Sequence, residues 1–132
     1  MLPTEPDFNP YEALGGEPAM RALVTRFYEL MDTLPEAYVI RKLHQESLDS
    51  AREKLFEYIS GWLGGPNLYE SKYGHPRMRG RHMPFAIGEA ERDAWLLCMA
   101  QAAKETLPEG AARDHFWEKV AGLADFMRNR EG

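Results

Sequence analysis

The chain has 132 residues, of which 44% are hydrophobic and 28% are charged, and these values are ordinary for one globular domain over residues 1–132. The net charge of −5 at pH 7 argues against non-specific binding to nucleic acid. A single cysteine, Cys98, excludes an internal disulfide, and neither a signal-peptide pattern nor a run of membrane-spanning length is found. We therefore expect a soluble cytoplasmic protein without a nucleic-acid or membrane partner.

The N-terminal segment predicts a loose arm followed by a short helix. Residues 1–9 hold two prolines and few apolar groups, so we expect no packed structure there. Asn9 can cap a helix, and Pro10 suits its first position because the missing N–H costs nothing there. The glycine pair Gly15-Gly16 should end this helix after one or two turns.

Residues 17–32 predict the first long helix. Its apolar residues recur at helical spacing and should form the buried face: Met20, Leu23, Val24, Phe27, Leu30 and Met31. Tyr28 lies at the edge of that face, where its ring can be buried while its hydroxyl needs a partner. Residues 33–48 contain Pro35 and His44 among residues of mixed polarity, so we expect a corner with at most short turns.

Residues 49–63 predict the second long helix, which Asp49 or Ser50 would cap. Its inward face should carry four apolar positions: Ala51, Leu55, Tyr58 or Ile59, and Trp62. The segment Gly64-Gly65-Pro66 should end the helix, and residues 67–74 should be a loop or a single turn.

Two further helices are predicted at residues 89–106 and 109–128, separated by Leu107-Pro108. Their inward residues should be Trp95, Cys98 or Met99, and Ala102 in the first, and Ala112, Phe116, Val120, Leu123 and Met127 in the second. Strand-like alternation is absent from the sequence, so the fold class should be all-α. Cys98 fits a small core residue better than a redox sensor.

The stretch from His75 to Phe85 is the most unusual part of the sequence. Pro76 can open a short helix and Pro84 should end it at about His82, which restricts the orientation of that histidine. The alternating arginines of this stretch suit an anionic partner. We interpret His82 as a ligand of haem iron and Arg81 as a partner of the haem propionates. The alternatives are a hydrogen-bonded structural histidine and a solvated or partner-binding arginine patch.

Other chemistries have weaker support in the sequence. One cysteine and four scattered histidines do not give the ligand spacing of a zinc site. The chain lacks a Cys-x-x-Cys-His motif, so any haem would be held non-covalently. Four serines, Ser47, Ser50, Ser60 and Ser71, fit capping or surface positions rather than a nucleophilic triad. The acidic last helix is a poor element for reading DNA.

Four motifs follow one another along the chain. They are Trp62-Leu63-Gly64-Gly65-Pro66, Tyr73-Gly74-His75-Pro76, Arg79-x-Arg81-His82-x-Pro84-Phe85-x-Ile87, and Arg92-Asp93-x-Trp95-Leu96-x-Cys98-Met99. Together they resemble the motifs of group II truncated haemoglobins, and the resemblance extends from about Asn9 to Met127. It implies a two-over-two helical sandwich around haem b, with the helices near 17–32 and 49–63 crossed against those near 89–106 and 109–128.

The resemblance also implies roles for individual residues. His82 would be the proximal iron ligand, and Arg81, Lys54 and Tyr69 would meet the propionates. Tyr28, His44 and Trp95 match the polar residues on the distal side, where bound ligands lie. Five further residues would contact the haem: Ala51, Leu55, Met78, Phe85 and Ile87. His44 departs from the family pattern, because this position usually holds Tyr or Phe, and a solvent-facing corner histidine is its alternative.

The implied function is binding of O2, NO and other diatomic ligands in a polar distal pocket. Because the Tyr hydroxyl, Trp N–H and His N–H can all donate to bound oxygen, we expect slow oxygen release, which favours redox or detoxification chemistry on NO or peroxide. The expected partners are these ligands and an unidentified reductase, with the protein a monomer or homodimer. The alternatives are an oxygen carrier, store or sensor without turnover, and a cofactor-free helical module that binds an acidic partner.

Overall fold

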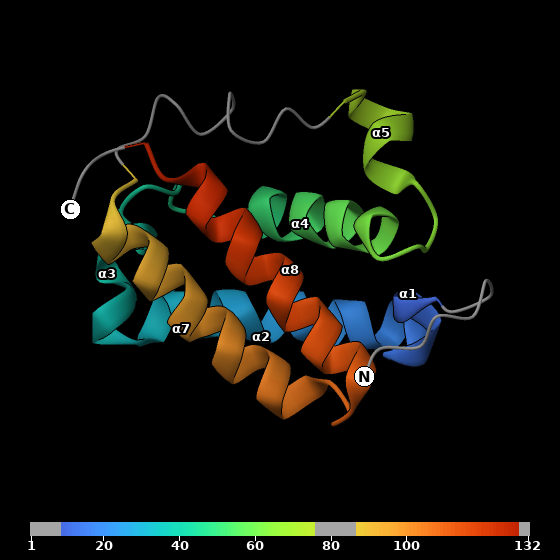
Figure 1. The fold of residues 1–132 in the computed structure, drawn as a ribbon. Helices are drawn as coiled ribbons and strands as arrows, with labels where there is room; N and C mark the ends of the chain where they lie inside the picture. The colour runs from blue at the N-terminus through green and yellow to red at the C-terminus, as the bar shows by residue number, and fades with distance from the viewer. Residues whose placement is uncertain (1–8, 76–86, 130–132) are drawn as a thin grey trace.

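The computed structural model describes residues 9–75 and 87–129, and every regular element in these ranges is a helix. Four long helices form the body: α2 (Gly16–Thr33), α4 (Asp49–Trp62), α7 (Glu89–Thr106) and α8 (Ala111–Met127). Helix α2 packs against both α4 and α7, and α7 packs against α8 (Figure 1). This arrangement confirms the all-α prediction and the two-over-two sandwich.

Short helices connect the long ones. Helix α1 (Pro10–Ala13) precedes α2, and the corner before α4 contains a 3-10 turn, η1 (Pro35–Ala37), and α3 (Tyr38–Arg41). Helix α5 (Leu68–Tyr73) follows α4 and lies against it (Figure 1), where the sequence predicted no more than a loop or single turn. The short helix predicted at about residues 76–82 lies outside the described residues.

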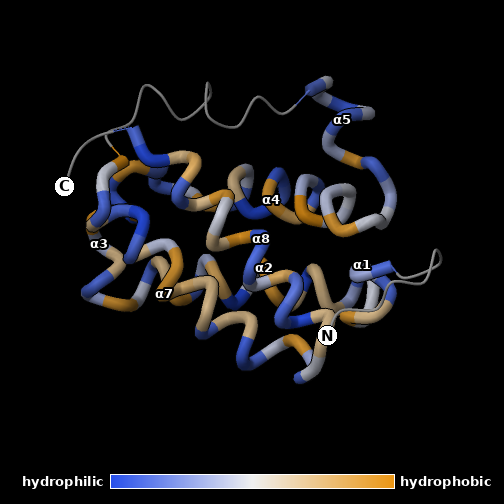
Figure 2. Tube along the Cα trace, in the orientation of Figure 1, coloured by the Kyte–Doolittle hydropathy of each residue, from blue (hydrophilic) through white to orange (hydrophobic). Residues whose placement is uncertain are grey.

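The apolar face of α2 was predicted correctly. All six residues of its stripe are buried, and they pack against buried residues of α7 and α8, including Met99 and Phe116. Hydrophobic and hydrophilic residues are interspersed along the long helices (Figure 2), as expected for helices with one buried and one exposed side. Within the described residues, no helix is both long and apolar enough to cross a lipid bilayer.

The predicted cap and the predicted first-position proline of the first short helix are both confirmed, because Asn9 is the cap residue of α1 and Pro10 is its first residue. The Asn9 side-chain oxygen accepts a hydrogen bond from the Glu12 backbone N–H at 3.1 Å, which caps α1. The Asn9 amide also donates to the Gly64 carbonyl oxygen at 2.8 Å, so α1 is attached to the end of α4. A Cβ atom on Gly65 would lie 2.6 Å from the Tyr11 ring, so this glycine is needed for the close approach.

The predicted cap of α4 was wrong. The helix begins at Asp49 with Leu48 in the cap position, and no side chain caps it there. The Ser47 hydroxyl instead accepts a 3.3 Å hydrogen bond from the Asp49 backbone N–H. Several polar residues at this corner could have capped the helix, and the path of the chain decided which of them accepts the hydrogen bond. The end of α4 at Trp62, with Gly64 at φ +102°, agrees with the prediction.

Helix α4 also buries two polar residues that the sequence did not identify. Ser60 is fully buried, not at a cap or the surface, and its hydroxyl has no hydrogen-bond partner among the described residues. The Glu57 side chain is only 1% exposed and forms an ion pair with Lys72 of α5. Because burial of a charge is costly unless it is paired, this contact fastens α5 onto α4.

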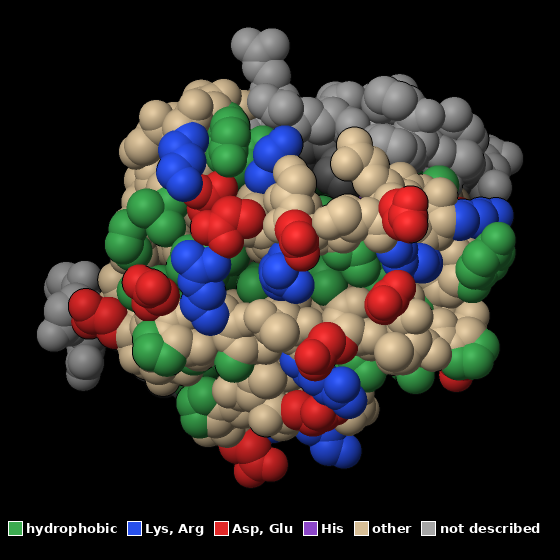
Figure 3. Space-filling model, turned by 180° about the vertical axis from the view of Figure 1, so that it is seen from behind, with side chains coloured by type: hydrophobic (Ala, Val, Ile, Leu, Met, Phe, Trp, Pro, Cys, Tyr) green, Lys and Arg blue, Asp and Glu red, His purple; other side chains and the backbone are tan. Residues whose placement is uncertain are grey.

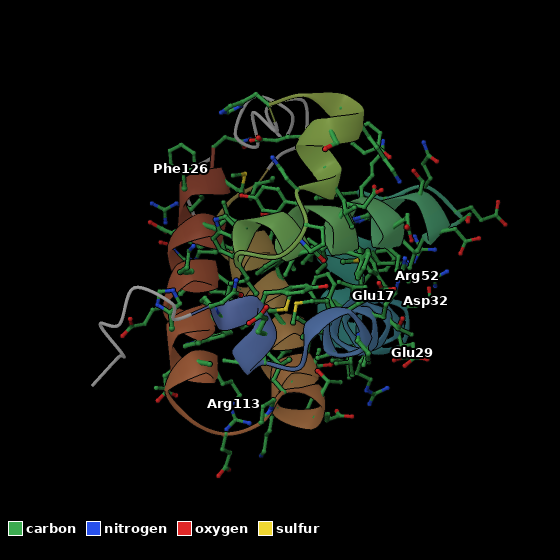
Figure 4. The ribbon with its side chains drawn as sticks, turned by 90° about the vertical axis from the view of Figure 1, so that its right-hand side faces the viewer. Glu17, Glu29, Asp32, Arg52, Arg113 and Phe126 are labelled. Atoms are coloured by element: carbon green, nitrogen blue, oxygen red, sulfur yellow. The ribbon has the colours of Figure 1, made fainter. Side chains whose placement is uncertain are left out.

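Ion pairs join the helices on the outside of the molecule. Arg26 of α2 pairs with Glu105 of α7 at 2.9 Å, and Arg21 of α2 pairs with Glu53 of α4 at 2.6 Å. Positive and negative side chains are interspersed on the face seen in Figure 3. The charged residues labelled in Figure 4, such as Asp32 and Arg52, lie at the outer edge of the helices and not in the interior. Exposed pairs of this kind each contribute little to stability.

Candidate functional site

A cavity of about 330 Å³ lies between α2, the corner after α3, α4, α5, the first half of α7 and the end of α8. Eight residues proposed from the sequence line it: Tyr28, His44, Ala51, Lys54, Leu55, Tyr69, Ile87 and Trp95. The other four, Met78, Arg81, His82 and Phe85, lie outside the described residues. The structure therefore brings the distal residues together, while iron ligation by His82 stays a prediction.

The three distal residues belong to one cluster of rings built around Phe27. The Phe27 ring centroid lies 4.9 Å from that of Tyr28 and 5.3 Å from that of Trp95, in edge-to-face arrangements. Tyr28 in turn makes an edge contact with His44 at 6.0 Å. Because Phe27 is fully buried in the core, it fixes Tyr28 and Trp95 at the cavity wall.

Burial favours the neutral form of the Tyr28 side chain. Desolvation raises the pKa of its phenol well above the ordinary value of 10.0, because the charged phenolate is disfavoured in the interior. The side chain therefore remains a neutral O–H at physiological pH. Such a group can donate a hydrogen bond to a ligand held in the cavity.

His44 contributes differently from what the sequence suggested. Its Nδ1 lies 2.8 Å from the Ile40 carbonyl oxygen. Because a carbonyl oxygen can only accept, Nδ1 must carry the proton, and Nε2 of the neutral ring then has none. A neutral His44 in this hydrogen bond can accept a hydrogen bond at Nε2 but cannot donate one. The donors at this wall are thus Tyr28 and Trp95, and His44 would join them only as imidazolium.

One side of the cavity carries groups suited to a carboxylate. Lys54 is exposed and lines the cavity from α4, and Tyr69, which is largely buried, lines it from α5. Arg92 lies on the α7 side, where it donates to Asp125 at 2.7 Å and to Asp93 at 3.0 Å. With its charge balanced by two carboxylates, Arg92 is less available to a ligand than Lys54.

The sequence predictions missed eight residues of the cavity wall: Ile40, Leu43, Tyr58, Glu91, Arg92, Leu123, Ala124 and Met127. Tyr58, Leu123 and Met127 were found as members of apolar helix faces, but helical spacing cannot distinguish a core face from a cavity face. Ile40 and Leu43 come from the irregular corner, whose path is set by tertiary packing. Arg92 belongs to one of the four motifs, so its position there was the available signal.

Cys98 lies in the core and not in the cavity wall. Its side chain is fully buried, and burial raises the pKa of the thiol to about 11, from an ordinary value of 9.0. A protonated, enclosed thiol is a poor nucleophile. This result agrees with the prediction of a small core residue.

The chain matches the model of the bacterial-like globin family over residues 9–129, nearly its whole length. The chain belongs to the bacterial-like globin family. Membership implies that this globin binds haem and a diatomic ligand on the haem iron.

Within the family, the similar proteins include group II truncated haemoglobins. The chain is 35% identical over 121 residues to the group 2 truncated haemoglobin YjbI of Bacillus subtilis, covering 92% of this chain and 89% of that protein. The structure of a group II 2-on-2 haemoglobin from Agrobacterium tumefaciens is 45% identical, with a TM-score of 0.92, over 98% of this chain and 100% of the other. A truncated oxygen-avid haemoglobin from Bacillus subtilis is 34% identical, with a TM-score of 0.85, over 92% and 100% of the two chains. The resemblance inferred from the four motifs is thereby confirmed.

The cavity of this globin fits haem, a flat apolar ring with two carboxylates at one edge. Apolar side chains from α4, from the residues just before α7 and from α8 line it, among them Leu55, Ile87 and Leu123. The cation of Lys54 and the hydroxyl-bearing ring of Tyr69 are present for the carboxylates. The start of α7 is fixed, because the Ile87 backbone N–H donates to the Asn129 side-chain oxygen at 2.9 Å.

Proposed function

We propose that this globin holds haem b non-covalently in the cavity between α2, α4, α7 and α8. His82 would be the proximal iron ligand, and Arg81, Lys54 and Tyr69 would bind the propionates. The order of the four motifs supports the assignment of His82 and Arg81, and the lining of the cavity supports that of Lys54 and Tyr69. Met78, Phe85 and Ile87 would contact the haem from the segment that contains His82.

The function that we propose is chemistry on a tightly held diatomic ligand, in preference to transport of oxygen. The single observation that carries this proposal is the convergence of Tyr28 and Trp95 on one wall of a largely apolar cavity. When bound, haem would supply the iron site on which O2 or NO binds and reacts. A hydrogen bond to a charged acceptor is worth about 1.5–3 kcal/mol. Since about 1.4 kcal/mol is tenfold in an equilibrium, two donors would slow oxygen release by about two orders of magnitude or more.

Slow release suits oxidation of NO to nitrate or reaction with peroxide, because both need a ligand that stays in place. The oxygen-avid haemoglobin of Bacillus subtilis is a structural relative, which supports slow oxygen release here. An unidentified reductase would return the iron to its ferrous state after each turnover. The second candidate is an oxygen store or sensor, which would share the hydrogen bonds and differ only in lacking turnover.

The first test is colour, because haem gives an intense absorption band near the violet end of the visible spectrum. We expect purified protein to carry about one haem per chain, and haem-free protein that takes up none would leave only the cofactor-free interaction module. Oxygen dissociation measured by rapid mixing should be slow. Dissociation as fast as that of an ordinary carrier would overturn the proposal of chemistry on a retained ligand.

The second test separates turnover from storage. NO is added to the oxygenated protein with a reducing system present, and nitrate is measured. Sustained nitrate production supports a detoxification role. Slow oxygen release combined with a single turnover favours the store or sensor.

A further inference from the structure

Three tyrosine rings lie in succession from the cavity to the surface. Tyr58 of α4 and Tyr69 of α5 both line the cavity, and their ring centroids are 6.0 Å apart. The Tyr69 ring lies 4.8 Å from that of Tyr73, which is 41% exposed. Helix α5, which carries the last two rings, sits on the outer side of α4 (Figures 1 and 4). The contacts thus connect the cavity wall to solvent without a gap between rings.

The outermost ring of this series is paired with a buried base. The Tyr73 hydroxyl donates to Glu57 Oε1 at 3.2 Å, and the Glu57 side chain is only 1% exposed. Lys72 holds the second oxygen of the same carboxylate. A phenol that loses an electron becomes a strong acid, and Glu57 is the group placed to take its proton.

Neighbouring charges make that proton transfer necessary. The ammonium nitrogen of Lys54 lies 5.6 Å from the Tyr73 ring centroid, so a positively charged ring there would be repelled. Loss of the proton together with the electron leaves a neutral ring and avoids the repulsion. The proton moves along an existing hydrogen bond, so no rearrangement of α5 is required.

We propose that Tyr69 and Tyr73 form an oxidation relay, in which oxidising equivalents pass from the cavity to the surface and Glu57 accepts the proton of Tyr73. The relay rests on the peroxide chemistry of the proposed function and adds a surface site for a reductant. The chemical class of that reductant is a small phenol, which can approach the exposed ring of Tyr73.

The electrons and atoms balance for reduction of a hydroperoxide, ROOH, by a phenol, ArOH. Breaking the O–O bond to give ROH and water consumes two electrons and, from solvent, two protons. Each electron passes inward from Tyr73 through Tyr69. Tyr69 is oxidised transiently and regains its electron from Tyr73 while it still holds its own proton, and Tyr73 gives its proton to Glu57 as it loses the electron. ArOH then gives an electron to Tyr73 and a proton to solvent, and Glu57 returns the proton. Two such cycles convert ROOH and two ArOH to ROH, water and two ArO radicals.

A competing branch starts from the other side of Tyr58. The Trp62 ring is stacked on Tyr58 at 5.7 Å, but the Lys119 ammonium lies 4.5 Å from the centre of the Trp62 ring. That positive charge opposes removal of an electron from Trp62. Tyr73 also has a cation near its ring, but it has the Glu57 carboxylate to remove its proton. The radical should therefore form on Tyr73 in preference to Trp62.

The test is to treat the ferric holoprotein with hydrogen peroxide and a nitroso spin trap, and then to locate the adducts by peptide mass spectrometry. We expect the main adduct on Tyr73. In samples of equal haem content, Tyr69→Phe should lower the Tyr73 adduct formed per peroxide consumed by about tenfold, equivalent to about 1.4 kcal/mol in a barrier. Tyr38 is the internal control, because it is more exposed, at 66%, and lies on α3 away from the rings. Adducts that follow exposure, with Tyr38 above Tyr73, would overturn the relay.

Two variants separate the role of Glu57 in proton transfer from its role in fastening α5. Glu57→Gln keeps the shape and a hydrogen-bond acceptor but is a far weaker base, so the Tyr73 adduct should fall. Lys72→Met removes the ion pair but keeps the carboxylate, so the adduct should persist. Equal losses in both variants, each with unchanged haem content and helicity, would show that Glu57 does not act as the proton acceptor.

A final arm tests the relay without peroxide chemistry. The protein is reconstituted with zinc protoporphyrin and illuminated with a cobalt(III) ammine complex as the one-electron acceptor, which oxidises the porphyrin. A Tyr73 adduct that depends on Tyr69 in this arm supports the relay even if the iron protein does not react with peroxide. Its absence overturns the relay even if the iron protein consumes peroxide rapidly. The two proposals can therefore fail separately.

Discussion

The inner faces of α2 and α4 look alike in sequence and have different roles in the structure. Both helices carry apolar residues at helical spacing. On α2 the stripe is closed by protein side chains, and residues such as Leu23 and Phe27 are fully buried. On α4 three residues of the predicted stripe, Ala51, Leu55 and Tyr58, are only partly buried and line the cavity. The dry contacts of α4 are made by Ile59, which the sequence offered as the alternative to Tyr58, and by Phe56, which the stripe did not include.

The difference shows that helical periodicity identifies an apolar face but not its occupant. The face of α2 is covered by other helices, so substitutions there should mainly change the stability of the fold. The face of α4 lines the cavity, so substitutions there should mainly change ligand binding. Phe27 belongs to the first class, yet its ring contacts Tyr28 and Trp95 and so joins the two regions.

The largest effect is expected for Phe27→Ala. Removal of this buried ring should lower the free energy of unfolding by about 3–5 kcal/mol and also release Tyr28 and Trp95 from their positions. Urea unfolding and oxygen dissociation are measured on the same samples. Phe116→Ala is the matched control, because Phe116 is equally buried and, within the described residues, makes no ring contact with Tyr28 or Trp95. It should destabilise the protein equally without changing oxygen release, and a parallel change in release would break the comparison.

Trp95→Phe should act on the ligand and hardly on the fold. Loss of one indole N–H donor should speed oxygen dissociation by about tenfold to a hundredfold, from a hydrogen bond of about 1.5–3 kcal/mol. Haem content should not change. Trp62→Phe serves as control, because Trp62 lies on α4 but does not line the cavity. An unchanged dissociation rate in Trp95→Phe would remove Trp95 from the set of donors.

Leu55→Ala sharpens the contrast between the two faces directly. Because Leu55 is partly buried at the cavity, its truncation should lower the free energy of unfolding of haem-free protein by about 1 kcal/mol. Leu23→Ala on α2 should cost about 2–5 kcal/mol. Thermal or urea unfolding of the two haem-free variants gives the loss of unfolding free energy for each. Equal losses would mean that the α4 face is ordinary core.

The smallest effect concerns pH and the buried thiol. The pKa of Cys98 is raised by burial from 9.0 to about 11, so the folded state keeps a proton that the unfolded state loses. The resulting stability is fully present below pH 9 and is lost as the pH rises from 9 to about 11. In Cys98→Ala the fall in unfolding midpoint across this window should be shallower. An identical pH profile in the two proteins would contradict the assigned shift.

Much of the site could be read from the sequence because its residues occupy fixed places in motifs. Trp95 and Ile87 belong to such motifs, and both line the cavity. His44, in a corner without periodicity, also lines the cavity. Its hydrogen bond to the Ile40 carbonyl could not be predicted, because that contact depends on how the short helix α3 ends. Because that hydrogen bond uses the ring N–H, the neutral His44 ring is an acceptor toward the cavity and not the donor that we expected.

The sequence by itself determined the number and order of the long helices, their apolar stripes, and the breaks at glycine and proline, because these depend on local backbone preference and on spacing along one helix. Only the tertiary structure decided which stripe became core and which became cavity wall. It also placed Glu57 beneath Lys72 and Tyr73, since a carboxylate looks like a surface residue until another helix covers it. Contacts between residues distant in sequence are set by the packing of all helices at once.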